Sequence, residues 1–353
     1  MSRKLSKKVT GMSALLGAAM AAAASLGMAP AASAATGSSW QGVADLQEAQ
    51  NASLTSIVMT SPSTGYVFQS VPGSRPAAYS LSGSKLKQVP FQSDPGEVVV
   101  ASAESSASNV WAFASLPDRY TEAIKLVNGR WDPVKTLGGR VTQVSVRSAK
   151  DVTVFGPLGT YHFNGSTWTR QGGAVSGGYS VAGTDDWTYE GTTVTHLVNG
   201  KAKNFNLVKD LPPQLKPAGM NDPAVDGVIA LTDRNVYAIG SGNAEDAGGP
   251  TWILHYDGST WKKIASYGRE AEGQPVSDGG GGFWEYVWAS GACYVLHYSA
   301  GKLSATMLPL NGGEPNYITA LALAPGSRDL VAVSNTQAAD GQPKFYGEVE
   351  SLG

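Results

Sequence analysis

The sequence has a single cysteine, Cys293, so no disulfide can form within the chain. Without cross-links, a chain of 353 residues depends on the burial of apolar surface. At about this length a folded protein buries roughly three quarters of the surface that its unfolded chain exposes. The segment ACYVLHY around Cys293 contains no cation that would lower the thiol pKa. We interpret Cys293 as an inert core residue, with a catalytic thiol as the weaker alternative.

Charged residues are also scarce, at 15% of the chain, and the formal net charge is −2. The first 34 residues carry four basic residues and no acidic ones, so their removal changes the net charge to −6. A nucleic acid or an anionic surface bound by bulk electrostatics is therefore not expected. Gly279 to Gly282 is not a phosphate loop, because neither a lysine nor a helix start follows it.

The N-terminus has the three regions of a secretory signal peptide. Basic residues lie between Arg3 and Lys8, an alanine-rich apolar run extends from Met12 to Pro30, and the small residues Ala32-Ser33-Ala34 form a cleavage site. A retained membrane anchor is the alternative. We expect residues 1–34 to be removed on secretion and residues 35–353 to form one domain without membrane insertion.

Glycine (43 residues) and tryptophan (9 residues) are abundant, and many of them belong to one recurring pattern. The clearest copy is TWILHYDGSTWKKI at Thr251 to Ile264. It reads as an apolar strand, a tight turn with glycine, and a second strand opened by tryptophan, which together predict a β-hairpin. Weaker copies begin at Tyr79, Ile124, Tyr161, Thr195 and Leu296.

A second pattern precedes each hairpin, and it consists of a short strand, a tight turn and an aromatic or β-branched strand. Asn235-Val236-Tyr237-Ala238-Ile239 is typical. Each unit therefore contains four antiparallel strands in about 45 residues, which is the repeat of a propeller blade. Seven units fit residues 35–353, so we predict an all-β, seven-bladed β-propeller.

The last unit ends without its fourth strand. The missing strand has a counterpart at the other end of the chain, where Gly37 to Val43 reads GSSWQGV and matches the GSTW segments of the hairpins. We predict that a strand beginning at Trp40 completes the last blade and closes the ring, which removes open strand edges. The alternative is that this segment is a flexible leader and the match is due to chance.

These repeats resemble those of secreted actinobacterial β-propellers, and their layout is similar to kelch and galactose-oxidase-type propellers. The resemblance is clearest at Val152 to Arg170 and Val236 to Ile264. It implies the fold more than an activity, because one fold hosts many functions.

In such a blade, the connections between second and third strands and between blades all lie on one face. They are long and variable in this sequence, and long irregular loops on a rigid scaffold are frequent sites of function. Ordinary solvated loop polarity is an equal alternative for any one residue. The candidate ligand-binding residues are Arg75, Asp118, Arg119, Tyr120, Glu245, Asp246, Arg269, Glu270 and Asp340.

Catalytic and metal-binding patterns are weak. The histidines His162, His196, His255 and His297 recur on the same strand of separate repeats, so they cannot share one zinc ion, and we interpret them as packing or surface residues. Cys293-Tyr294 lacks the histidine cluster of a copper oxidase. Ser277 to Trp284 faintly resembles the Asp box of sialidases, which is structural. We predict no metal, no cofactor and no catalytic set.

Three functions remain open. The first is a secreted, monomeric, non-enzymatic module that binds an extracellular glycan, a cell-wall polymer or a protein. The second is an extracellular hydrolase or lyase acting on a carbohydrate or lactone, which would need two suitably spaced carboxylates. The third is a component of a cell-envelope assembly. A carboxylate with a perturbed pKa near the axis would favour an enzyme, whereas exposed aromatic residues on the loop face would favour a binding module.

Overall fold

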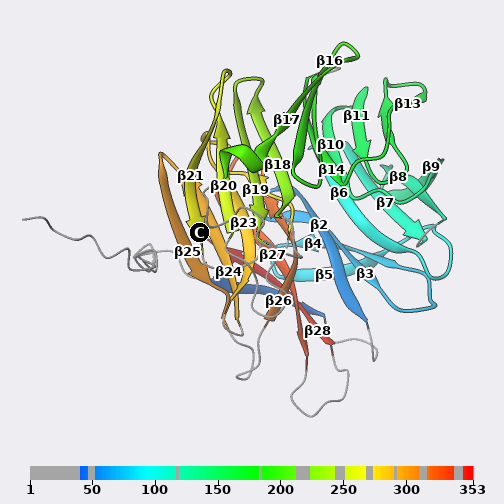
Figure 1. The fold of residues 1–353 in the computed structure, drawn as a ribbon. Coiled ribbons are helices and arrows are strands. Elements are labelled where there is room, and N and C mark those ends of the chain that lie inside the picture. Colours follow the sequence, from blue (N-terminus) through cyan, green and yellow to red (C-terminus); the bar gives the residue numbers. More distant parts are fainter. Residues whose placement is uncertain are drawn as a thin grey trace, which may run out of the picture.

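The computed structural model describes residues 40–46, 52–116, 119–182, 185–211, 223–242, 251–267, 273–289, 292–309, 316–337 and 345–352. Within these ranges the chain forms seven four-stranded antiparallel sheets, arranged as the blades of a β-propeller (Figure 1). The predicted fold class is therefore confirmed. Each first strand contacts the first strand of the next blade, and the series returns from β26 to β2, so these strands form the inner ring.

The strands follow one another from the inside of each blade outward. Blade 1 contains β2 (Ser53–Ser61), β3 (Thr64–Ser70), β4 (Ala77–Ser82) and β5 (Lys85–Val89). Blade 2 contains β6 (Val98–Ser106), β7 (Asn109–Leu116), β8 (Tyr120–Val127) and β9 (Arg130–Gly138). Blade 3 contains β10 (Gln143–Ser148), β11 (Asp151–Phe155), β12 (Thr160–Phe163) and β13 (Trp168–Gly172). Blade 4 contains β14 (Gly177–Ala182), β15 (Asp185–Glu190), β16 (Thr193–Val198) and β17 (Lys201–Asn206), which the short 3-10 helix η1 (Leu207–Asp210) follows.

The remaining blades have the same order with two departures. Blade 5 contains β18 (Ala224–Thr232), β19 (Asn235–Ser241), β20 (Thr251–Tyr256) and β21 (Trp261–Tyr267). Blade 6 contains β22 (Val276–Ser277), β23 (Phe283–Ala289), β24 (Ala292–Ser299) and β25 (Lys302–Met307), and its first strand has only two residues. Blade 7 contains β26 (Asn316–Leu323), β27 (Leu330–Gln337), β28 (Phe345–Leu352) and, as its outer strand, β1 (Trp40–Leu46).

Strand β1 closes the ring as the sequence predicted. It pairs antiparallel with β28, with Trp40 opposite Leu352 and Leu46 opposite Gly347. Asn335 of β27 adds a second tie across the junction of blades 7 and 1, because its side chain accepts from the Leu54 amide at 2.8 Å and donates to the Leu54 carbonyl at 2.9 Å. The first and last segments of the chain therefore share one sheet.

In several blades the outer strand begins at or next to a tryptophan, and this tryptophan packs against an aromatic residue of the preceding blade. Trp131, Trp168 and Trp261 pack edge-on against Tyr66, Trp111 and Trp187 of the preceding blades, with ring centroids 5.2, 5.8 and 6.1 Å apart. Such edge-to-face pairs add to the free energy gained by burial. Trp40 and Trp284 occupy the same two positions and belong to one core cluster at blades 6 and 7. The recurring tryptophan is thus an inter-blade contact.

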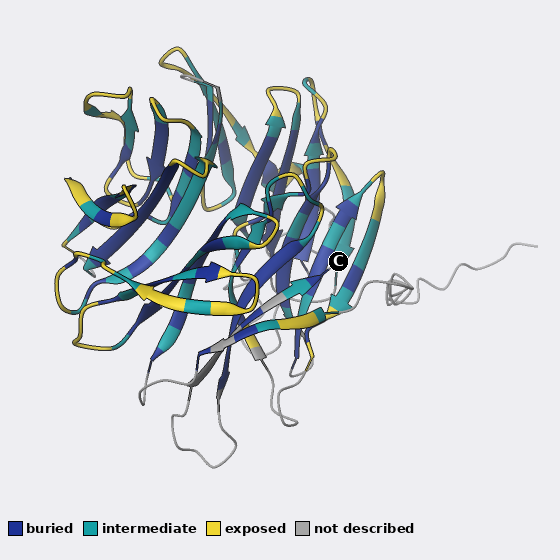
Figure 2. Cartoon of the chain, turned by 180° about the vertical axis from the view of Figure 1, so that it is seen from behind, coloured by how far each residue is buried: buried dark blue, intermediate teal, exposed yellow. Residues whose placement is uncertain are grey.

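Burial changes from strand to strand across each blade, as Figure 2 shows. Second strands are buried almost throughout, as in β7 and β19, because neighbouring blades cover both of their faces. Outer strands such as β17 are mostly exposed. The core consists of clusters between adjacent blades, each drawn from two or more sheets. Cys293 lies in one of them and is 2% exposed, consistent with the interpretation of a core residue.

The connections divide between two faces of the ring. We call one the short-turn face; it carries the tight turns between first and second strands and between third and fourth strands. The other, which we call the long-connection face, carries the connections between second and third strands and between blades. One expectation about this face was wrong. The sequence placed Tyr120 in a long loop, but β7 ends at Leu116 and Tyr120 already begins β8, because alternating apolar residues continue the strands further than the polar residues suggested.

Candidate binding site

A central channel with a volume of about 750 Å³ passes through the ring and is lined mainly by the first strands. Its wall is rich in hydroxyl and amide groups that tie neighbouring blades together. Ser56 and Ser102 share a hydrogen bond of 2.7 Å between blades 1 and 2, and the Ser145 hydroxyl accepts from the Ser180 amide at 3.1 Å between blades 3 and 4. These bonds give partners to polar groups of the channel wall, because the apolar side chains between the blades cannot form hydrogen bonds.

At the long-connection end, polar side chains link blades 3, 4 and 5. Gln143 donates to the Tyr189 hydroxyl at 3.1 Å, and Tyr189 donates to the Asp226 carbonyl at 2.7 Å. Gln274 lies just before the first strand of blade 6. Its side chain donates to the carbonyl of Thr142, which lies just before the first strand of blade 3 on the opposite side of the ring. Gln274 therefore crosses the mouth of the channel on this face.

Glu285 breaks the apolar pattern one strand outward from this mouth. Its side chain is 1% exposed, where the equivalent positions in other blades carry residues such as Val67, Ala112 and Ala238. Oε1 accepts from the Tyr286 amide at 3.0 Å, whereas Oε2 has no hydrogen-bond partner among the described residues. Burial, with a smaller contribution from the nearby Asp226 carboxylate, raises the Glu285 pKa well above its ordinary value. Burial therefore favours the protonated, uncharged form of Glu285.

A stacked aromatic pair lies on the long-connection face at blades 6 and 7. The rings of Trp288, near the end of β23, and Tyr317, near the start of β26, stack with centroids 4.5 Å apart and planes 10° from parallel. Tyr317 is 38% exposed, whereas Trp288 is partly buried against the core cluster of blades 6 and 7. We call Trp288 and Tyr317 the aromatic patch. The sequence analysis missed it, because the two rings lie on different blades.

Acidic residues gather on the same face where blades 1 and 2 meet. The Tyr120 hydroxyl donates to Asp94 Oδ2 at 2.7 Å, and Glu97 Oε2 accepts from the Asp94 amide at 2.8 Å. Glu122 on β8 is close enough to raise the pKa of both Glu97 and Tyr120. We call Asp94, Glu97, Tyr120 and Glu122 the acidic cluster.

The environment shifts the pKa of each of three groups in the acidic cluster upward. Burial raises the pKa of Glu97 to about 7, with further contributions from Glu122 and Asp94. Burial and then the Asp94 charge raise the pKa of Glu122. The hydrogen bond to Asp94, followed by burial and the neighbouring carboxylates, raises the pKa of Tyr120 to about 12. Burial is the largest cause for the two glutamates and the hydrogen bond to Asp94 for Tyr120, and neighbouring carboxylates add to all three shifts.

The structure brings only some of the predicted residues together. Tyr120 belongs to the acidic cluster, and Arg75 and Arg119 are exposed on connections that flank it. The connection that carries Arg75 contacts the connection that carries Glu97 directly, because the Gly96 amide donates to the carbonyl of Ser74 at 2.7 Å. The other candidates lie outside the described residues: Asp118, Glu245, Asp246, Arg269, Glu270 and Asp340.

The four histidines are structural, in agreement with the sequence interpretation, and each has a polar partner near a first turn of its own blade. His162 contacts Asp151 at 2.9 Å, His196 contacts Asp185 at 2.6 Å, and His297 contacts Asp278 at 3.0 Å. In blade 5, His255 contacts Asn235 at 2.9 Å. Three of these rings also stack on an aromatic residue of the second strand. Each histidine thus connects the third strand of its blade, by a side-chain hydrogen bond, to the turn between the first and second strands.

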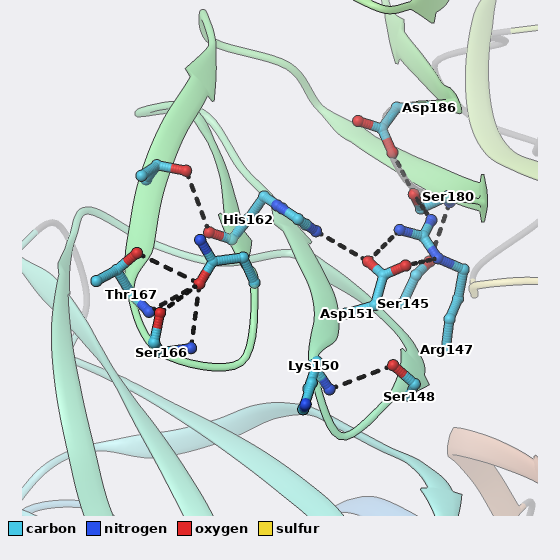
Figure 3. A network of polar contacts seen from close by, with 12 residues as sticks. Ser145, Arg147, Ser148, Lys150, Asp151, His162, Ser166, Thr167, Ser180 and Asp186 are labelled. Atoms are coloured by element: carbon cyan, nitrogen blue, oxygen red, sulfur yellow. Dashed lines mark hydrogen bonds and ion pairs between the residues drawn. The ribbon is translucent and has the colours of Figure 1, made fainter.

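Blade 3 extends this contact across the boundary to blade 4, as Figure 3 shows. Asp151 binds both His162 and Arg147, and Arg147 donates to Ser180, which in turn donates to Asp186. Asp186 is fully buried, and burial raises its pKa. The network lies at the short-turn end of the channel, away from the acidic cluster and the aromatic patch. The ion pair of this network joins Arg147 and Asp151, so both charges have a partner within the protein.

Replacement of Asp278 tests whether these contacts stabilise the fold. Its Oδ1 accepts from the Gly280 and Gly282 amides at 2.7 and 2.8 Å, and its Oδ2 bonds His297. We expect Asp278→Ala to lower the free energy of unfolding by about 2 kcal/mol, because the buried Gly282 amide and the partly buried Gly280 amide and His297 ring lose their acceptor. Urea unfolding would measure the loss. Asp278→Asn keeps an acceptor and should retain most of the stability, and equal losses in both variants would contradict this role.

Within the described ranges, no three His, Cys, Asp or Glu side chains lie close enough together to hold a metal ion. No helix among the described residues is long and apolar enough to span a membrane.

Comparison with known proteins supports the fold. No protein-family model matches the chain, and no curated protein matches it. The structure of YCF48 bound to D1 peptide is similar, with a TM-score of 0.58 at 11% identity, over 88% of this chain and 96% of that one. The WD40 β-propeller domain of Doa1 has a TM-score of 0.58 at 13% identity, over 89% and 97% of the two chains.

A third similar structure is the extracellular domain of the hybrid two-component system BT4673 from B. thetaiotaomicron. It has a TM-score of 0.60 at 10% identity, and the match covers 88% of this chain and 39% of that one. These identities are low, so the likeness concerns the fold alone. The chain is a seven-bladed β-propeller whose structural neighbours include WD40-type propellers.

Proposed function

We propose that this propeller is an exported, non-enzymatic module that binds a protein partner through its long-connection face. The observation that carries the proposal is the Trp288–Tyr317 stack on that face, in which Tyr317 is exposed and Trp288 is partly buried. The similarity to YCF48, which was solved with a bound peptide, supports a peptide-like ligand. Residues 1–34 supply the export signal in this proposal, and sequencing of the protein from culture medium should begin at Ala35.

Stacked aromatic pairs of this kind are good anchors for a partner. Tryptophan and tyrosine are rigid, bury a large apolar area and are over-represented among residues that dominate binding energies. Trp288 and Tyr317 are already stacked, so little side-chain entropy is lost when a ligand covers them.

The proposal predicts that binding depends on the aromatic patch. We expect Trp288→Ala and Tyr317→Ala each to weaken the binding of peptides selected on the wild-type protein by about tenfold or more. Fluorescence anisotropy with labelled peptides from a displayed random dodecapeptide library would measure the change. Val127→Ala removes an exposed apolar residue at the short-turn end and serves as the matched control.

A glycan array run with the same variants separates the other ligand classes. Binding to glycans with no enriched peptide, and loss of that binding in Trp288→Ala, would replace the protein partner by a carbohydrate. Peptide binding that is unchanged in both aromatic variants would overturn the proposed face.

A hydrolase or lyase is the second candidate, and Glu285 is the observation that favours it. Glu285 is a buried carboxyl beside Asp226, and its raised pKa favours the protonated form that a general acid needs. A screen of carbohydrate and lactone substrates would test this function. Turnover by the wild-type protein that Glu285→Gln abolishes would favour the enzyme over the binding module.

A further inference from the structure

We infer that the acidic cluster at blades 1 and 2 binds a basic side chain, lysine or arginine, of the protein partner. This inference rests on the proposed function and names the chemistry that the long-connection face selects. The aromatic patch lies at the boundary of blades 6 and 7 and the acidic cluster at the boundary of blades 1 and 2, so blades 7 and 1 lie between them around the ring. An extended ligand segment that follows this face across blades 7 and 1 would meet both.

The first argument is the missing positive charge. Asp94, Glu97 and Glu122 raise one another's pKa or that of Tyr120, so their carboxyl groups lie close together. Among the described residues, none of the three forms an ion pair, although four ion pairs of arginine or lysine with aspartate are formed elsewhere. Arg75 and Arg119 flank the cluster but form no described ion pair with it. The excess negative charge is left for a ligand.

The second argument is an unpartnered, buried acceptor. Glu97 is 1% exposed, and its Oε2 is bonded to the Asp94 amide, whereas Oε1 has no hydrogen-bond partner among the described residues. The Ser93 hydroxyl next to Asp94 is also buried without a described partner. A buried polar atom without a bond is costly, and bonds from a charged donor are the strongest available to a carboxylate. An incoming N–H donor would satisfy Glu97 Oε1.

The third argument distinguishes an organic cation from a metal ion. A metal needs its ligands within about 2.0–2.6 Å of one point, and the described acidic side chains do not approach one another closely enough for that. A guanidinium or an ammonium carries several N–H donors spread over a larger volume. It can therefore contact carboxyl groups that are near one another without sharing one centre.

The test is a displayed random dodecapeptide library selected against two proteins. One is the wild-type protein, and the other is the double variant Glu97→Gln with Glu122→Gln, which keeps side-chain size. We expect lysine and arginine to be enriched in wild-type selections and the enrichment to be lost in the double variant. Asp233→Asn with Asp329→Asn removes two carboxyls from the short-turn loops and controls for net charge.

The affinities of one enriched peptide then measure the coupling free energy between its arginine and the acidic cluster. Replacement of its arginine by neutral citrulline should weaken binding to the wild-type protein by about tenfold and to the double variant by much less. Wild-type binding should also strengthen between pH 6 and pH 8, because Glu97, with its pKa raised to about 7, ionises over that range while arginine keeps its charge.

The outcomes separate this inference from the proposed function. Peptides that depend on Trp288 but show no basic enrichment would overturn the acidic cluster as a site and leave the binding face intact. Basic enrichment that persists in the double variant would place the cation elsewhere and also overturn the inference. Calcium alone, titrated calorimetrically, that binds the wild-type protein, fails with the double variant and displaces the peptide would overturn it in favour of a metal. Absence of any selected peptide would overturn both proposals.

Discussion

A chain from which β1 (residues 40–46) has been deleted should lose the closed ring and most of its stability. We expect the free energy of unfolding to fall by more than about 5 kcal/mol, a large part of what a domain usually has. The deletion removes a whole strand that pairs with β28 along its length. It also removes Ala44 and Leu46, which are 9% and 6% exposed. A loss of several buried side chains costs roughly this much.

The deletion should also expose an edge. Strand β28 lies between β27 and β1, so without β1 its outer hydrogen-bonding groups have no partner and can pair with another molecule. Trp284 would lose Trp40 from its cluster, the counterpart of the Trp187–Trp261 contact. We therefore expect oligomers or aggregates beside the loss of stability.

Thermal unfolding and size-exclusion chromatography would measure both effects. A mature chain that lacks only residues 35–39 is the matched control and should behave as the wild-type protein, because the strand begins at Trp40. A synthetic peptide of residues 37–46 added to the deleted chain should restore part of its melting temperature. A deleted chain that stays monomeric with an unchanged melting temperature would contradict closure by β1.

Most of the fold could be predicted from the sequence because each blade is specified locally. The turn chemistry of a hairpin such as Tyr256 to Trp261 lies within a few residues, and its repetition sets the number of blades. The match between Trp40 and Trp261 located the closing strand, because one contact to the preceding blade is used repeatedly. Blade 6 was harder to delimit, since its first strand has only two residues.

The candidate site was predicted only in part because it depends on contacts between blades. Loop length directed attention to the long-connection face and to Tyr120, but the partners of Tyr120 come from the connection before β6 and from within β8. The Trp288–Tyr317 pair joins residues of two blades, and no local pattern marks it. Glu285 follows Trp284 in an aromatic strand and was not singled out, although a lone carboxyl in such a run was the available signal.

The pH dependence of stability should change most when Glu285 is replaced. Burial raises the Glu285 pKa well above its ordinary value, so the folded protein keeps a proton that the unfolded chain releases once the pH exceeds about 4.5. The folded state then binds more protons than the unfolded state, and stability falls as pH rises from there through the folded-state pKa. The slope for one such group is about 1.4 kcal/mol per pH unit.

Glu285→Gln removes this titration and keeps an acceptor for the Tyr286 amide. We expect the variant and the wild-type protein to differ little near pH 5, and the variant to become progressively more stable than the wild-type protein as the pH rises from there toward 8. Urea midpoints measured from pH 5 to pH 8 would show the two curves diverging. Asp233→Asn, at an exposed short-turn carboxyl, should leave the wild-type slope unchanged. Parallel curves for Glu285→Gln and the wild-type protein would mean that Glu285 is ionised in the fold, and the general-acid alternative would lose its basis as well.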